Sequence, residues 1–165
     1  MNYQKCTECD NSATTKYYLH FGVCYQNTSL PDGFGSHYTY TSVPCQDTRC
    51  NKCQDNFQVC TRCLNSPTMY YFHASNSSCL IVNEIPNGYG AAVVLSYGET
   101  RTCTTPSCFA CQLDYSTCGE CAPNNPPRWV YINTCTLQTS LPNGYGADSV
   151  SKSAIPCSHS NCLQC

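Results

Sequence analysis

The 18 cysteines constrain this chain of 165 residues more than any other feature, because they follow one spacing three times. Each repeat has the pattern C-x2-C-x13–15-C-x20–23-C-x4-C-x2-C, and six residues separate one pattern from the next. The cysteines are Cys6, Cys9, Cys24, Cys45, Cys50 and Cys53, then Cys60, Cys63, Cys79, Cys103, Cys108 and Cys111, then Cys118, Cys121, Cys135, Cys157, Cys162 and Cys165. None falls outside the pattern, so we predict three tandem cysteine-rich repeats, at residues 1–53, 54–111 and 112–165.

The composition indicates that these cysteines form structural disulfides. Cysteine makes up about 11% of the chain, and Leu, Ile, Val and Phe together only about 16%, too few for a conventional core. Small units that cannot bury enough apolar surface are held together by disulfides, and these persist outside the reducing cytosol. We therefore predict that all 18 cysteines are disulfide-bonded and that the protein is extracellular or at the cell surface. Six cysteines per repeat allow 15 pairings, and we expect each CxxC cysteine to bond outside its own motif.

Zinc is the alternative explanation for the CxxC pairs. The segments at 50–63 and 108–121 each place four cysteines within 14 residues, as a four-thiolate zinc site would. No histidine stands at ligand spacing from a CxxC, and two cysteines of each repeat lie outside any CxxC. The Thr/Ser/Asn-rich composition also favours secretion, so we expect no metal or other cofactor, while a zinc-binding CxxC module stays a lesser alternative.

The residues between the cysteines predict short β-strands and no helix. Aromatic and β-branched residues cluster at 16–19, 69–72 and 128–131, and further strands are expected at 38–41 and 91–97. The turns LPDGFG, IPNGYG and LPNGYG occur at 30–35, 85–90 and 141–146. In each, proline presets φ for the second turn position, the first glycine permits positive φ, and the second glycine lets backbone approach closely. We predict a small, mainly β fold in which the repeats stack end to end as an elongated rod.

Charge and hydropathy exclude several function classes. The eight Lys and Arg are scattered and the pI is about 6, so nothing indicates nucleic-acid binding. No apolar stretch approaches the roughly 20 residues of a transmembrane helix. The N-terminal sequence MNYQKCTECD lacks the basic and apolar regions of a signal peptide. We expect a mature chain or a segment of a longer array.

Two N-x-S/T sequons predict N-linked glycans, at Asn27 and at Asn76. Each stands near the third cysteine of its repeat, in a segment expected to be a surface loop. Repeat three has no equivalent beyond NTC at 133–135, which is a poor acceptor.

The six-cysteine pattern with a CxxC at both ends and a P-[ND]-G-[YF]-G turn resembles the repeats of ciliate surface antigens of the immobilisation type. It resembles more loosely the furin-like repeats of growth-factor receptors and the CxxC-rich variant surface proteins of protozoan parasites. The resemblance covers the whole chain and implies an extracellular, non-enzymatic coat or ectodomain protein. Such proteins often carry a signal peptide and a C-terminal hydrophobic anchor, and because neither is written in these 165 residues we expect a segment of a longer protein.

The leading hypothesis is a glycosylated structural protein of a cell-surface coat or extracellular filament, whose partners are copies of itself placed end to end or side by side. The alternative is an adhesive or ligand-binding ectodomain, for which the long segment 80–102 is the candidate binding region. No catalytic nucleophile with a base and no open metal site can be named, so we expect no enzyme activity.

Overall fold

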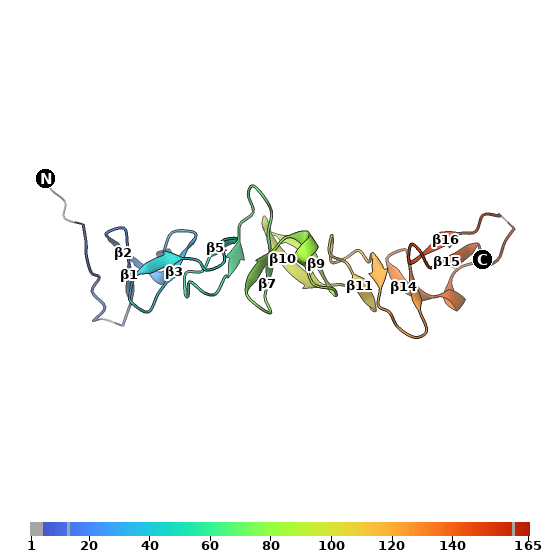
Figure 1. Ribbon diagram of the computed structural model, residues 1–165, viewed down its shortest axis with the longest axis horizontal. Coiled ribbons are helices and arrows are strands. Elements are labelled where there is room, and N and C mark those ends of the chain that lie inside the picture. Colours follow the sequence, from blue (N-terminus) through green and yellow to red (C-terminus); the bar gives the residue numbers. More distant parts are fainter. Residues whose placement is uncertain (1–4, 13, 160) are drawn as a thin grey trace. The chain divides into compact units, whose positions relative to one another are not determined.

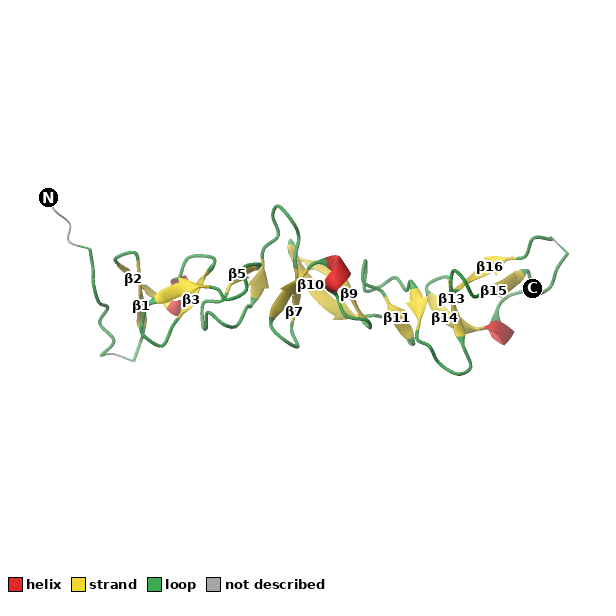
Figure 2. Cartoon of the chain, viewed as in Figure 1, coloured by secondary structure: helices red, strands yellow, loops and turns green. Residues whose placement is uncertain are grey.

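The computed structural model describes residues 5–12, 14–159 and 161–165, and it divides into two compact units. Unit one comprises Met1–Ile81 with Val93–Glu99, and unit two comprises Val82–Ala92 with Thr100–Cys165. The described residues form short strands joined by loops and three short 3-10 helices, with no α-helix among them (Figure 2). These elements and eight disulfides confirm the predicted small, mainly β, disulfide-rich fold. The stacking of repeats into a rod stays a prediction.

Unit one is built from short antiparallel pairs, coloured blue to green in Figure 1. Its elements are β1 (Tyr17–His20), β2 (Val23–Gln26), η1 (Asn27–Ser29), β3 (Phe34–Ser36), β4 (Ser42–Pro44), β5 (Cys50–Lys52), β6 (Arg62–Cys63), β7 (Tyr71–His73) and β8 (Ser78–Leu80). β1 pairs with β2, β3 with β4, β5 with β6, and β7 with β8.

Unit two contains a second series of the same elements. They are η2 (Val82–Glu84), β11 (Cys108–Ala110), β12 (Glu120–Cys121), β13 (Arg128–Tyr131), β14 (Thr134–Leu137), η3 (Gln138–Ser140), β15 (Tyr145–Asp148) and β16 (Ser153–Pro156). β11 pairs with β12, and the sheet of repeat three has the order β14-β13-β16-β15. Two longer strands, β9 (Tyr89–Val94) and β10 (Tyr97–Thr102), contribute residues to both units.

Each repeat joins two hairpins through one parallel contact. In repeat one the contact is the bridge between Leu19 and Thr41. In repeat two β10 pairs in parallel with β7, with Gly98 opposite Tyr71. In repeat three Val130 lies opposite Ser153, where β13 pairs with β16. A similar arrangement three times over is what a repeated cysteine and turn pattern should produce.

Two of the expected strands fold differently. Residues 38–41 form the loop between β3 and β4, because Tyr40 adopts a φ of 58° and donates its N–H to the carbonyl of His37. Residues 91–97 form two strands rather than one, because Leu95 and Ser96 both have positive φ and reverse the chain between β9 and β10. Sequence reasoning missed both turns, since neither contains glycine, proline or asparagine.

The core consists mostly of disulfides. In unit one a buried cluster of Cys45, Cys50, Cys53, Cys60, Cys63 and Cys79 is covered by partly buried Phe57, Tyr70 and Phe72. The residue before each turn proline is also buried: Leu30 in unit one, and Ile85 and Leu141 in unit two. The aromatic residues therefore contribute to stability by covering disulfides, as a chain poor in aliphatic residues requires.

None of the helices among the described residues has the length and apolar character needed to span a membrane.

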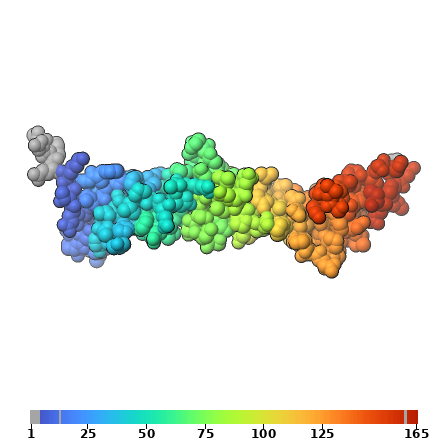
Figure 3. Space-filling model, viewed as in Figure 1, coloured from blue at the N-terminus to red at the C-terminus, as the bar shows by residue number. Residues whose placement is uncertain are grey.

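In the space-filling view, the green loop that links β6 to β7 projects from the surface of unit one (Figure 3).

Candidate functional site

The candidate functional site is the joint between consecutive repeats, and the disulfide pairing defines it. The second cysteine of a repeat bonds to the third, and the fourth bonds to the sixth. The bonds inside repeats are Cys9–Cys24, Cys45–Cys53, Cys63–Cys79, Cys103–Cys111, Cys121–Cys135 and Cys157–Cys165. The fifth cysteine bonds instead to the first cysteine of the next repeat, in the bonds Cys50–Cys60 and Cys108–Cys118. None of the eight disulfides joins the two cysteines of one CxxC motif, which confirms the expectation that CxxC cysteines bond outside their own motif.

Each joint disulfide closes over the six residues that connect the repeats, 54–59 in joint one and 112–117 in joint two. A two-strand ladder holds the cysteines in place. Cys50 lies opposite Cys63 where β5 pairs with β6, and Cys108 lies opposite Cys121 where β11 pairs with β12. The opposed cysteines do not bond to each other. Cys50 bonds instead to Cys60, and Cys108 to Cys118, and both of these partners lie just before the second strand of the ladder. A bulge follows each opposed pair.

The backbone of each joint is bound to the hairpin of the repeat before it. In joint one, Ser36 donates its N–H to the carbonyl of Gln54 at 3.1 Å and accepts from the N–H of Phe57 at 3.3 Å. In joint two, Ala91 makes the same bonds with Gln112 and Tyr115, at 3.0 and 3.2 Å. The backbone of joint one is therefore hydrogen-bonded to β3, and that of joint two to β9, so neither joint is a free linker.

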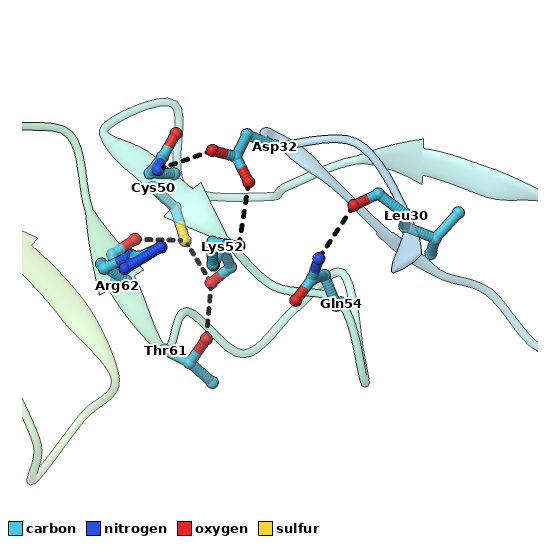
Figure 4. Close-up of polar contacts among 8 residues, drawn as sticks. Leu30, Asp32, Cys50, Lys52, Gln54, Thr61 and Arg62 are labelled. Atoms are coloured by element: carbon cyan, nitrogen blue, oxygen red, sulfur yellow. Dashed lines mark hydrogen bonds and ion pairs between the residues drawn. The ribbon is translucent and has the colours of Figure 1, made fainter. Parts of the chain in front are cut away.

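Side chains add a second layer of contacts at joint one (Figure 4). Asp32 accepts a hydrogen bond from Asn51 at 3.1 Å and forms an ion pair with Lys52 at 3.2 Å. Gln54 donates to the carbonyl of Leu30 at 2.8 Å, and the hydroxyl of Thr61 donates to the carbonyl of Lys52 at 3.0 Å. The ion pair is solvent-exposed and contributes little, so the buried disulfide and the backbone bonds stabilise the joint.

The turn motif brings the backbone of each repeat against its own disulfide. The first glycine of the motif has a φ of 82° to 84° in all three copies: Gly33, Gly88 and Gly144. A Cβ on Gly35 would lie 2.2 Å from the carbonyl oxygen of Cys53, and one on Gly90 would lie 2.1 Å from that of Cys111. Both predicted glycine roles are confirmed.

The predicted role of the turn proline is wrong. The residue after each first glycine donates its N–H to the carbonyl of the proline, as Phe34 does to Pro31 at 3.1 Å. This bond makes the proline the first residue of the turn rather than the second, so aspartate or asparagine occupies the second position.

Among the described residues, sulfur atoms gather in three clusters: one where a free thiol lies beside a disulfide, and two where two disulfides meet. The groups are Cys6, Cys9 and Cys24, then Cys50, Cys60 and Cys79, then Cys118, Cys121 and Cys135. Disulfide sulfurs carry no thiolate charge, and only Cys6 in these groups is a free thiol. In the bonded state described, these clusters therefore do not present the set of thiolates that zinc requires.

The predicted pairing of all 18 cysteines needs one correction. Cys6 and Cys162 are free thiols, so the described residues contain eight disulfides instead of nine. The physical reason is that one bond per repeat crosses a joint, and three repeats contain only two joints. Sequence reasoning missed this crossing bond, although the constant six-residue length of both joints was a visible sign of a fixed geometry.

The two predicted glycosylation residues lie in different environments. Asn76 is exposed in the tight turn between β7 and β8, and its side-chain oxygen accepts a hydrogen bond from Ser78 at 2.6 Å. Asn27 is half-buried at the start of η1, and its amide donates to Asp55 of joint one at 2.7 Å. Glycosylation at either position stays a prediction.

One carboxylate in joint two has a shifted pKa. The backbone N–H of Ser116 and its hydroxyl donate to Asp114 at 2.9 and 2.8 Å, and these bonds lower the pKa of Asp114 below its ordinary value. Joint one has Asn56 at this position, and it accepts the N–H of Gln58 in the same way, at 3.0 Å. The side chain thus fixes the joint turn in both copies.

Comparison with known proteins adds no relative: no protein-family model, no curated protein and no solved structure matches this chain.

Proposed function

We propose that this chain is a non-enzymatic structural protein of an extracellular coat or filament, built from disulfide-closed β repeats. One observation carries the proposal: each joint between repeats is closed by its own disulfide, Cys50–Cys60 or Cys108–Cys118. A protein that needs only three separate domains can use open linkers. A covalent closure at every joint keeps consecutive repeats in register, which is a property that a coat or filament requires.

The heavy disulfide bonding is consistent with an extracellular protein, because structural disulfides form and persist mainly in oxidising compartments. The disulfide-rich core also fits a protective layer. Each joint disulfide closes a loop of about ten residues and stabilises the folded state by roughly 3 kcal/mol in the chain-entropy account. The resemblance to ciliate surface-antigen repeats supports the same function, with glycans at Asn27 and Asn76 hydrating the outer surface.

The test uses intact cells or matrix from the organism that makes this protein. An antibody against the folded chain should label unpermeabilised cells, and the native protein should resist protease until a reductant is added. Labelling only after permeabilisation, together with reactive thiols and stoichiometric zinc, would exclude the extracellular structural role in favour of a zinc-binding module.

An adhesive ectodomain is the second candidate. The segment 80–102 that was its expected binding region contains a regular hairpin, β9 and β10, instead of an irregular loop. A different feature of unit two favours it: a cavity of about 380 Å³ lined by Trp129, by the cationic side chains of Arg128 and Lys152, and by one carboxylate, that of Glu120. An aromatic side chain beside cationic groups suits an acidic sugar. Binding of acidic glycans that is lost in Trp129→Ala would support this function over the structural one.

A further inference from the structure

Cys6 and Cys162 are the only free thiols among the described residues, and they occupy complementary places in the repeat. Cys6 is the first cysteine of repeat one, and Cys162 is the fifth cysteine of repeat three. At both internal joints, a fifth cysteine is bonded to the first cysteine that follows, as in Cys50–Cys60 and Cys108–Cys118. Each free thiol is therefore one half of a bond that this chain makes twice.

The sulfur of Cys6 makes the same two contacts within its repeat as a bonded first cysteine, and it is partly exposed where Cys60 and Cys118 are buried. It lies 2.9 Å from the carbonyl oxygen of Glu8, where the equivalent distance is 3.2 Å for both Cys60 and Cys118. Its distance to the sulfur of the third cysteine is 3.5 Å, against 3.4 and 3.7 Å in repeats two and three. The free thiol is thus held where its bonded counterparts are held.

The sulfur of Cys162 matches a bonded fifth cysteine equally well. It lies 3.1 Å from the carbonyl oxygen of Gln164, and the equivalent distances are 3.0 Å for Cys50 and 3.4 Å for Cys108. The backbone N–H of Cys162 donates to the carbonyl of His159 at 3.0 Å, as the N–H groups of Cys50 and Cys108 do three residues back, at 3.0 and 3.1 Å.

The sequence before Cys6 matches a joint. Asn-Tyr-Gln at residues 2–4 stands at the same distance from Cys6 as Asn-Phe-Gln at residues 56–58 stands from Cys60. The aromatic residue three places before the cysteine recurs as Tyr115 before Cys118. In the two internal joints this aromatic residue pairs its backbone with Ser36 or Ala91. The position equivalent to these two in repeat three is Ala147, which lies on β15.

We propose that Cys162 forms a disulfide with the first cysteine of an adjoining repeat, and that Cys6 forms the same bond with the fifth cysteine of a preceding repeat. Between two copies of this chain, the bond is Cys162–Cys6. The same chemistry would join this segment to a further repeat of one longer polypeptide. The inference deepens the proposed function because it names the cysteines through which one repeat joins the next. The purpose of the bond, assembly of a coat or filament, rests on the proposed function, whereas the formation of the bond does not.

The bond forms by exchange with a small-molecule disulfide. The thiolate of Cys162 attacks oxidised glutathione, which gives a mixed disulfide and releases one glutathione thiolate. The thiolate of Cys6 then attacks the Cys162 sulfur and releases the second glutathione. Two protein thiols are oxidised to one disulfide, and one oxidised glutathione is reduced to two thiols.

The test uses the folded, oxidised chain with Cys6→Ser and Cys162→Ser as matched variants. In a glutathione redox buffer at about pH 8, the unaltered chain should give a ladder of covalent oligomers. Each variant alone should stay mainly monomeric with a small amount of homodimer, and an equal mixture of the two should give one predominant covalent dimer linked through Cys162 and Cys6. We expect this dimer to exceed either variant's homodimer by roughly tenfold, since the pairing is specific.

Three outcomes would overturn the proposal: homodimers of either variant as abundant as the mixed dimer, no ladder at any protein concentration, or an internal Cys6–Cys162 bond in the monomer. If the ladder is absent while the monomer keeps eight disulfides and its protease resistance, the bond is refuted and the structural function stands. Peptide mapping of native material separates the two sources of the partner. A link from Cys162 to the peptide of Cys6 identifies a second copy, and a link to a CxxC peptide of another sequence identifies a further repeat.

Discussion

At the scale of the residue, backbone conformation decides which side chains this chain tolerates. The first glycine of each turn motif has positive φ, and the second approaches a disulfide. Several other residues adopt positive φ without being glycine, among them Leu95 and Ile132, with φ of 48° and 44°. Such conformations cost free energy for branched or bulky residues. The fold therefore contains positions where the natural residue is not the most stable one.

Leu95→Asn is expected to raise the free energy of unfolding by about 1 kcal/mol, because asparagine accepts positive φ in a two-residue hairpin turn. The side chain of Leu95 is 87% exposed, so little packing is lost. Denaturant unfolding with the disulfides intact measures the change. A decrease would mean that the exposed leucine makes a contact that stabilises the hairpin.

Gly90→Ala is expected to lower the free energy of unfolding by about 3 kcal/mol, because its Cβ would overlap backbone atoms of Cys111 and Tyr115. Gly119→Ala is the matched control, since its nearest neighbour is at 3.4 Å, and it should change stability by less than about 0.5 kcal/mol. Equal effects at both positions, measured by denaturant unfolding, would contradict the close approach at the turn.

Asp114 should make the stability of joint two depend on pH. Hydrogen bonds from Ser116 lower the pKa of Asp114 in the folded state. The ionised carboxylate therefore contributes its full stabilisation of the joint above the ordinary aspartate pKa of the unfolded chain, and this stabilisation is lost as the pH falls through the lowered pKa of the folded state. Hydrogen exchange of the Ser116 amide should therefore show weaker protection under acidic conditions. Asp114→Asn should remove this dependence while keeping the turn, as Asn56 does in joint one. Persistence of the pH effect in that variant would assign it to another group.

At the scale of the element, the joint is a strand edge closed by a disulfide. Joint one pairs with Ser36 and joint two with Ala91, and one bond, Cys50–Cys60 or Cys108–Cys118, closes each. Both joints use the same backbone contacts although only their first residue, glutamine, is identical. Backbone geometry, cysteine position and the acceptor side chain of Asn56 or Asp114 therefore specify the element.

Replacing Cys50 and Cys60 together by alanine is expected to lower the free energy of unfolding by roughly 3 kcal/mol and to open residues 54–59 to proteases. Changing both cysteines avoids a leftover thiol that could exchange with neighbouring disulfides. The control is the double alanine variant of Cys45 and Cys53, whose bond lies within repeat one and does not close a joint. It should lose stability without cleavage at 54–59; cleavage there in both variants would show that the joint disulfide has no special role.

At the scale of the whole molecule, the chain is stabilised by covalent bonds in place of a large apolar core. An isolated monomer with eight disulfides and two thiols should be about 16 Da lighter than its fully reduced form. Intact mass with a thiol count measures this, and a difference of about 18 Da with no thiols would indicate an internal ninth bond instead.

Secretion from a eukaryotic cell is expected to give fuller glycan occupancy at Asn76 than at Asn27. The first lies in an exposed turn, and the second shares its amide with Asp55 once the joint forms. Peptide mapping after glycan release gives the occupancy of each. Asp55→Ala should raise occupancy at Asn27 without affecting Asn76, and no change would show that folding does not compete with modification there.

Much of the fold could be predicted from residue types. The short strands at 17–20, 71–73 and 128–131 lie within a residue or two of the aromatic clusters, and both turn glycines behave as their chemistry requires. The turns at Tyr40 and at Leu95 could not be predicted, because tertiary pairing of the flanking strands imposes positive φ on residues with no local preference for it.

The order and types of the residues were enough to predict that the chain repeats, that it is mainly β and that cysteine replaces an aliphatic core. These conclusions depend on spacing and composition, which are properties of the chain before it folds. Which cysteines bond to each other became known from the folded structure. Spacing leaves 15 pairings open in each repeat, and a disulfide requires two sulfurs within about 2 Å. That condition is met across the joint by Cys50 and Cys60, and by Cys108 and Cys118. The strand ladders place the fifth cysteine of one repeat opposite the second cysteine of the next, and the first cysteine, three residues earlier in the chain, comes within bonding distance of the fifth.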